Sequence, residues 1–233
     1  MTGHNPEPGL NNRDKDPVSR GGLPAGIIIL PLAEPDVEEA ARLYIEVFLA
    51  DEPTSHRIAP DPATLLPSAE WYVRSLADRN FSFIARDERS GDLVGFIFCY
   101  DLADDFGQEK SRFTALFANF REAIVMIDEL ENRYLDLSGV SPGSVLHAFQ
   151  GGVGRKYRRA GVFAALVRQA VSCARDRGFG KIIGDCTSSA SQEILEQCGF
   201  RVEGFLGYDA FTIDGVRFFD GLPGGITLMV KDL

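Results

Sequence analysis

The hydrophobic and polar positions along the chain follow two periodicities, one typical of strands and the other of helices. From residue 26 onward, segments rich in branched and aromatic residues alternate with segments whose apolar side chains recur every three or four positions. The first pattern predicts strands at 26–32, in a hairpin over 81–100, at 145–153, at 181–186 and beyond residue 200. The second predicts helices at 35–50, 67–77, 111–134, 159–177 and 189–197. No internal repeat is visible, so we expect one α/β domain over residues 25–233, with a strand–loop–helix unit at its centre.

The first 24 residues have neither periodicity. They are polar and rich in proline, glycine and asparagine, which predicts a disordered tail over residues 1–24. The segment has no apolar core of the kind found in signal peptides, and no apolar run in the chain approaches the roughly 20 residues of a membrane-spanning helix. The four cysteines lack the spacing of a metal site, so we expect them to be reduced and the protein to be cytoplasmic.

Charge is unevenly distributed along the chain. The formal net charge is -10, from 24 lysines and arginines against 34 aspartates and glutamates, which argues against nucleic-acid binding over the whole surface. Yet eight basic residues gather between residues 155 and 181, where Asp176 is the single acid. The cluster also lacks the interleaved aromatic residues of a single-strand nucleic-acid platform, so we expect no nucleic acid as a partner.

The densest part of this basic cluster coincides with the predicted start of a helix. Cations are unfavourable there because the helix dipole is positive at its N-terminus, unless a bound anion compensates them. Free N–H groups at a helix start bind anions, and a glycine lets a ligand approach the backbone closely. The segment therefore predicts a loop that holds a phosphate group, although it has neither GK[ST] nor GxGxxG.

The loop residues Arg158-Arg159-Ala160-Gly161-Val162-Phe163 resemble the pyrophosphate loop, [RQ]xxGx[GA], of the GNAT superfamily of acetyl-CoA-dependent N-acetyltransferases. The order of predicted strands and helices is also similar to that superfamily's. The resemblance implies an α/β GNAT fold, with a central mixed, mostly antiparallel sheet flanked by helices. It further implies that residues 158–164, ending at Ala164, hold the pyrophosphate of acetyl-CoA, and that the Val153 N–H polarises the thioester carbonyl. Phe163 departs from the motif, which has a small residue at that position.

A second motif stands at the end of the first predicted helix. Asp51 and Glu52 follow a helix C-terminus, where negative charge is unfavourable, and Pro53 stops the helix. The stretch from Phe48 to Pro53 resembles the F-x-x-D-E-P signature of the insect-type arylalkylamine N-acetyltransferases, which include dopamine acetyltransferases. That resemblance implies that Glu52 is the general base, whereas chemistry alone would allow Asp51 the same role.

The segment Cys186-Thr187-Ser188-Ser189-Ala190-Ser191 is similar to the C-[ST]-S-x-x-S segment of the same subfamily. The resemblance implies that Thr187 and Ser191 supply functional hydroxyls. Many GNAT enzymes use a tyrosine here as general acid, but no tyrosine occurs between Thr187 and Phe200. Ser191, Thr187 or water would then protonate the leaving thiolate. The chain also has Pro223-Gly224-Gly225 where the subfamily often has Pro-His, which implies a different amine pocket.

These observations predict an enzyme that moves an acetyl group from acetyl-CoA to a small primary amine. A polyamine, an amino acid or a protein N-terminus remain alternative acceptors, as does a non-catalytic acyl-CoA-binding module. We expect no membrane partner, no metal, since there are only three histidines, and a monomer or homodimer. His56 and His147 are interpreted as structural or exposed, Cys186 and Cys198 as core or site-lining, and the apolar face of helix 111–134 as ordinary core.

Overall fold

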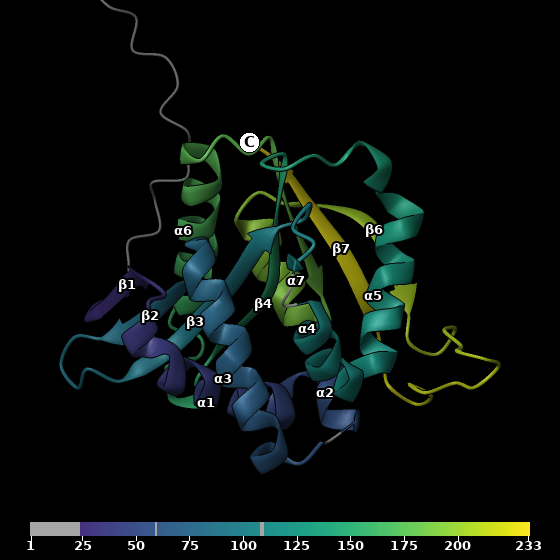
Figure 1. Ribbon diagram of the computed structural model, residues 1–233, viewed down its shortest axis with the longest axis horizontal. Coiled ribbons are helices and arrows are strands. Elements are labelled where there is room, and N and C mark those ends of the chain that lie inside the picture. Colours follow the sequence, from purple (N-terminus) through teal and green to yellow (C-terminus); the bar gives the residue numbers. More distant parts are fainter. Residues whose placement is uncertain (1–23, 59, 108–109) are drawn as a thin grey trace, which may run out of the picture.

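A seven-stranded sheet forms the centre of the molecule (Figure 1). The computed structural model describes residues 24–58, 60–107 and 110–233, so all but Pro24 of the expected tail lies outside the described residues. The strands, in chain order, are β1 Ile27–Pro31, β2 Phe83–Asp87, β3 Leu93–Asp101, β4 Val145–Val153, β5 Lys181–Cys186, β6 Arg201–Gly207 and β7 Gly225–Asp232. They lie in the order β1-β2-β3-β4-β5-β7-β6.

The strand pairing is mixed and mostly antiparallel, as the sequence predicted. Only β4 and β5 run parallel, and they pair over three residues, Val145–His147 of β4 with Lys181–Ile183 of β5. Beyond His147, β4 stays paired with β3 and β5 stays paired with β7. The sheet therefore splits in its middle, between the C-terminal halves of its two central strands.

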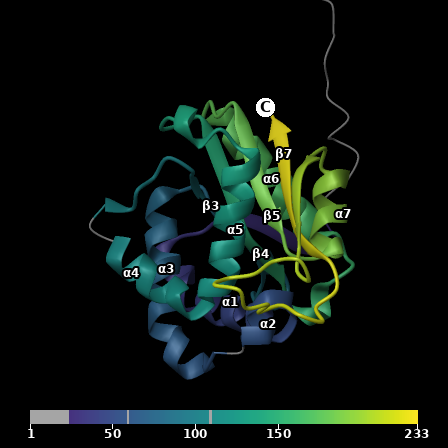
Figure 2. The same ribbon diagram turned by 90° about the vertical axis from the view of Figure 1, so that its right-hand side faces the viewer.

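Helices cover both faces of the sheet. They are α1 Val37–Asp51, α2 Pro53–Ile58, α3 Pro62–Arg79, α4 Lys110–Phe117, α5 Arg121–Tyr134, α6 Val162–Asp176 and α7 Ser189–Gln197. Helices α1, α3 and α4 pack on one face and α6 on the other, and α5 covers β5 and β7 on the same face as α1. Figure 2 shows α3 and α4 on one side of the strands and α7 on the other.

Three predicted helices differ from the structure. Helix α3 begins earlier than expected, at Pro62, because the Asp61 carboxylate accepts a hydrogen bond from Thr64 N (3.0 Å) and caps it. The predicted helix 111–134 is two helices, α4 and α5, separated by a 3₁₀ turn at Ala118–Phe120. Helix α6 begins at Val162 instead of 159, after a 3₁₀ turn at Arg155–Tyr157.

All four cysteines are free, and three of them are buried. None of the described helices combines the length and the apolar character that a membrane-spanning segment needs.

Candidate active site

A cavity of about 410 Å³ occupies the split between β4 and β5. Its edges are the halves of the two strands that are not paired with each other. They run from Ala148 to Val153 on β4 and from Gly184 to Cys186 on β5. Side chains from both faces of the sheet complete it. Phe163 of α6 and Ile194 of α7 line it on one face, and residues of α1, α2 and α5 line it on the other. The cavity thus passes through the sheet.

Two glycines let helices pack closely on both faces of β4 beside this cavity. A Cβ added to Gly151 would enter the ring of Phe163, and one added to Gly152 would lie 2.6 Å from Val47 Cγ1 of α1. The Gly151-Gly152 pair therefore lets side chains of α6 and α1 approach the β4 backbone closely. A β-bulge lies nearby, because Phe98 faces Gln150 while Cys99 faces Ala148, which leaves Phe149 as the extra residue.

The last residue of β4 directs its polar backbone atoms into the split. Gly154 N donates to Val94 O (2.9 Å), and hydrogen bonding alternates along an antiparallel strand. The N–H and C=O of the neighbouring Val153 therefore point away from β3. In agreement, Arg158 Nε donates to Val153 O (3.0 Å) from that side. The Val153 N–H is placed where it can donate to a ligand in the cavity.

Glu52 also lines the cavity, at the junction between α1 and α2. It ends α1 in an extended conformation, and α2 begins at the next residue, Pro53. Its carboxylate accepts hydrogen bonds from Thr54 N (3.1 Å), Thr54 Oγ1 (2.8 Å) and Ser55 N (2.6 Å). Pro53 stops α1 as expected, but it also starts a helix, which the sequence did not predict.

This geometry corrects the electrostatic argument made from the sequence. Glu52 follows the unfavourable C-terminus of α1, yet it caps the N-terminus of α2, where a carboxylate is stabilised. The capping bonds hold the carboxylate in one orientation at the cavity wall. The position of Glu52 after a helix C-terminus is therefore no evidence for function by itself. The evidence for function is that its carboxylate is held in one orientation at the cavity wall.

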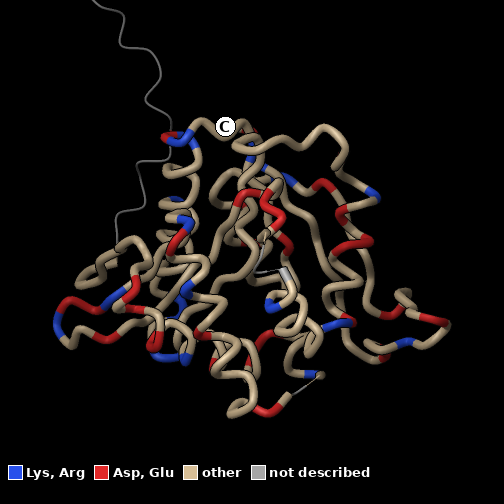
Figure 3. Tube along the Cα trace, viewed as in Figure 1, with Lys and Arg blue, Asp and Glu red and all other residues tan. Residues whose placement is uncertain are grey.

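Asp51 points to a different partner from that of Glu52. Its carboxylate accepts hydrogen bonds from Arg155 (2.7 Å) and Arg158 (2.8 Å) of the basic loop. The Arg158 guanidinium, assisted by Arg155, lowers the pKa of Asp51 below its ordinary value. Acidic and basic residues are interspersed along the described chain (Figure 3). At this point Asp51 of α1 partly neutralises the basic cluster.

The start of α6 follows a tight turn with two residues of positive φ. Arg159 and Gly161 adopt left-handed backbone angles, with φ of 62° and 80°. Gly161 is the N-cap residue, and no side chain caps the helix there. The first N–H groups of α6 are therefore available to a ligand. Arg159, Ala160 and Gly161 are exposed, Val162 is buried and Ala164 is half-buried.

The two predicted hydroxyls lie across the cavity, after β5. Thr187 and Ser191 both line the cavity and are half-buried. The Thr187 carbonyl accepts a hydrogen bond from Tyr208 Oη (2.9 Å), which fixes the strand end. Ser188 caps α7 through Ser191 N (3.3 Å), and Ser191 Oγ donates to Ser188 O (2.8 Å). These bonds orient the first turn of α7 toward the split.

Several solved structures with a similar fold are named as acetyltransferases. Arylalkylamine N-acetyltransferase 2 from Aedes aegypti is 21% identical, with a TM-score of 0.72 over 88% of this chain and 98% of that one. The polyamine N-acetyltransferase of Drosophila melanogaster is 16% identical, with a TM-score of 0.71 over 89% and 100%. The Salmonella typhimurium protein yncA, solved with its cofactor acetyl-CoA, is 14% identical, with a TM-score of 0.54 over 89% and 94%. No protein-family model matches the sequence.

The chain has the GNAT acetyltransferase fold. The fold expected from the sequence is thereby confirmed.

Within this GNAT fold, one cavity brings together six of the predicted site residues. They are Glu52, Val153, Arg158, Phe163, Thr187 and Ser191. The other five predicted residues do not line the cavity. Arg159, Ala160, Gly161, Val162 and Ala164 form the turn and the first turn of α6 beside it. Cys186 is buried and lines the cavity, which agrees with its interpretation as a core or site-lining residue.

The sequence missed two groups of cavity residues. Phe117, Phe120, Ile124 and Ile127 were interpreted as ordinary core, but they line the cavity. Their helical periodicity is the same in either case, so the sequence holds no signal that separates the two roles.

Tyr44 and Gln150 form the second group. Gln150 Nε2 donates to Tyr44 Oη (3.0 Å), and burial raises the pKa of Tyr44 far above its ordinary value.

Proposed function

We propose that the protein transfers an acetyl group from acetyl-CoA to a small primary amine, which attacks the thioester directly in a ternary complex. The observation that carries this proposal is that one cavity is lined by Glu52, Val153, Thr187 and Ser191 and by residues from both faces of the sheet. A donor and an acceptor can each enter from its own face and meet in the split. The similar structures named as N-acetyltransferases support the same chemistry.

The donor is assigned to the side of α6 and α7. A pyrophosphate is an anion, and the uncapped N–H groups at the start of α6 together with Arg158 are suited to hold it. Arg158 would exchange its bond to Asp51 for a bond to phosphate. The Val153 N–H would donate to the thioester oxygen and stabilise the negative charge that develops there.

The acceptor is assigned to the opposite side, beside Glu52. An alkylamine is mostly protonated near neutral pH, because its pKa is close to the roughly 10.4 of lysine. The Glu52 carboxylate attracts the ammonium and takes one proton, directly or through a water. The amine nitrogen then bonds to the carbonyl carbon, the C–S bond breaks, and the nitrogen releases its second proton to water. Ser191, Thr187 or water protonates the thiolate. The aromatic wall of Phe48, Phe120 and Phe149 favours a small arylalkylamine.

An amine panel tests this proposal. With acetyl-CoA, thiol release should depend on the added amine, and arylalkylamines should give a higher kcat/KM than polyamines, amino acids or peptide N-termini. Mass spectrometry should find one acetyl group on the amine. If acetyl-CoA binds but no amine releases thiol, the protein is a non-catalytic acyl-CoA-binding module. If a polyamine or peptide is preferred, the acceptor assignment is wrong while the chemistry stands.

Removal of Arg158 tests the pyrophosphate assignment. Arg158→Ala should weaken acetyl-CoA binding about tenfold to a hundredfold, since a charge-assisted hydrogen bond contributes about 1.5–3 kcal/mol. Calorimetric titration should also show that a truncated acetyl thioester without pyrophosphate binds wild type weakly and loses little further affinity in the variant. Arg168→Ala removes an arginine of α6 that lies outside the cavity, so it is the control and should bind normally. Equal losses for both ligands in Arg158→Ala would contradict the assignment.

A further inference from the structure

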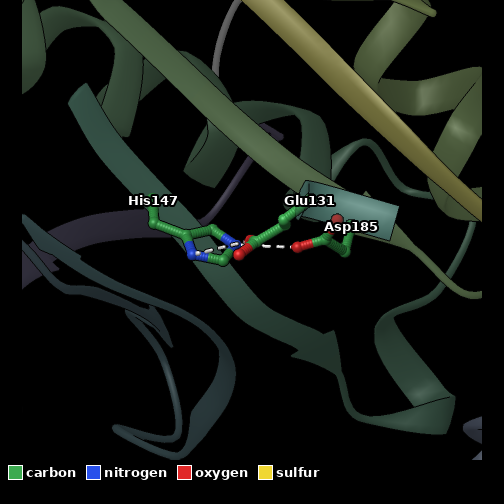
Figure 4. Close-up of side chains that lie close together, drawn as sticks. All are labelled: Glu131, His147 and Asp185. Carbon is green, nitrogen blue, oxygen red and sulfur yellow. Dashed lines mark hydrogen bonds and ion pairs between the residues drawn. The ribbon is translucent and has the colours of Figure 1, made fainter. Parts of the chain in front are cut away.

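Three ionisable side chains that the proposed reaction does not use are buried together beneath α5 (Figure 4). They are Glu131 of α5, His147 of β4 and Asp185 of β5. The side chains of His147 and Asp185 are each 1% exposed, and that of Glu131 is 11% exposed. His147 Nε2 lies 2.9 Å from Asp185 Oδ2, and His147 Nδ1 lies 3.6 Å from Glu131 Oε1. His147 is therefore buried among acids and not exposed.

The cluster holds more acids than bases. Two buried carboxylates face a single imidazole, and the salt bridges of the described residues join them to no lysine or arginine. Burying a carboxylate is costly unless a cation or several hydrogen bonds compensate it. The rings of Tyr100 and Phe149, 5.2 and 5.1 Å from that of His147, enclose the imidazole in apolar surroundings.

Each member of the cluster also keeps one polar atom without a hydrogen-bond partner among the described residues. These atoms are Glu131 Oε1, His147 Nδ1 and Asp185 Oδ1. Buried polar atoms are nearly always satisfied, so three unsatisfied atoms in one cluster indicate a missing partner. All three residues can act as metal ligands, and they can offer ligand atoms that lie within 4.8 Å of one another.

We propose that Glu131, His147 and Asp185 bind a divalent transition-metal ion, for which Zn²⁺ is the best candidate. Zinc accepts one imidazole nitrogen and two carboxylate oxygens at about 2.0–2.2 Å, so a bound ion would draw these three side chains closer together. An imidazole ligand favours zinc over magnesium and calcium, which prefer oxygen alone. Two positive charges neutralise the two carboxylates. A scarcity of histidines does not exclude such a site, because it uses only one.

The position of the site indicates what the ion does. His147 pairs with Ile183 at the last point where β4 and β5 are joined, just before the split. Glu131 lies one helical turn after Ile127, a residue of the cavity wall. An ion bound there would link α5 to both central strands and fix the acceptor wall of the cavity. Its role is therefore structural, and its loss should lower stability before it changes the chemistry.

Zinc binding can be measured directly on full-length protein freed of any affinity tag and stripped with a chelator. Calorimetric titration with ZnCl₂ should give one site per chain. At about a hundredfold excess over Kd, zinc should raise the unfolding temperature by about 5–10 °C. MgCl₂ at the same concentration should give no shift. Absence of saturable zinc binding would overturn the proposal and leave the cluster as a proton-sharing network.

Shape-preserving variants locate the site. Glu131→Gln and Asp185→Asn remove one buried charge each, so without metal they should unfold at the wild-type temperature or higher. Both should bind zinc at least tenfold more weakly and lose most of the zinc-induced shift. His56→Ala and Cys173→Ser remove other ligand-type residues of the chain and should keep that shift. The proposal fails if the cluster variants keep it or if the controls lose it. These readouts are independent of acetyl transfer.

Discussion

Glu52→Gln should lower the turnover number about 10²–10⁴-fold, the range expected when a general base is removed. The amide keeps one oxygen, which in place of Oε2 can still accept the bonds from Thr54 Oγ1 and Ser55 N. The bond from Thr54 N is lost, but the junction of α1 and α2 should keep its shape. Acetyl-CoA affinity should stay near that of wild type, because Glu52 lies away from α6. Steady-state kinetics at saturating donor and calorimetric titration with acetyl-CoA measure the two quantities separately.

Two neighbouring variants separate catalysis by Glu52 from its structural role. Thr54→Val removes the hydroxyl that donates to Glu52 (2.8 Å) but leaves the carboxylate, and it should keep most of the turnover. Asp51→Asn breaks the bonds to Arg155 and Arg158 and should also keep most of it. The pH–rate profile should lose or move its acidic limb only in Glu52→Gln. If Asp51→Asn abolishes turnover while Glu52→Gln does not, the roles of the two acids are reversed.

The second large effect is on stability. Gly152→Ala should reduce the free energy of unfolding by about 1–3 kcal/mol, the usual cost of forcing an extra methyl group into a packed core. The new Cβ would lie 2.6 Å from Val47 Cγ1 and 3.1 Å from Phe96 Cζ, and both of those side chains are buried. Neither can move without disturbing α1 or β3. Urea denaturation, supported by a decrease of about 2–12 °C in the unfolding temperature, measures the loss.

Gly151→Ala is the matched control for this prediction. Its Cβ would meet only the outer edge of the Phe163 ring at short range, and Phe163 is half-buried and can rotate toward the cavity. We expect a smaller loss of stability than for Gly152→Ala. Equal losses would mean that the backbone of β4, and not the packing against α1, sets the requirement for glycine.

The sequence predicted most elements because their signals are local. The run VLHAFQGGV and the segment SASQEILEQ have bounds identical to those of β4 and α7, since apolar alternation and a serine cap act within a few residues. Local signals also explain the errors. Pro53 was interpreted only as a stop, although a proline is equally suited to the first position of a helix. The 3₁₀ turn at Ala118–Phe120 leaves helical spacing almost unchanged and was therefore invisible.

The parts of the site that the sequence missed depend on contacts between distant residues. Arg158 was assigned to phosphate from its position in the loop, but its bond to Asp51 joins residues 107 positions apart. His147 and Asp185 meet because β4 and β5 pair in parallel for only three residues, and no periodicity encodes that register. Glu52 and Ser191 could be named from motifs. That they line one cavity follows only from the split of the sheet.

The split has a consequence for how specificity can diverge. The cavity wall that we propose for the acceptor comes mainly from α1, α2 and the segment from Phe117 to Ile127, with Phe149 of β4. The wall that we propose for the donor comes mainly from Val153 and the residues after it. The two walls are therefore encoded by separate stretches of the gene. Mutations can remodel the first stretch while selection preserves the second, so new acceptors can evolve without loss of the donor. Exchange of residues 44–55 and 117–127 between proteins of this fold is the corresponding engineering route.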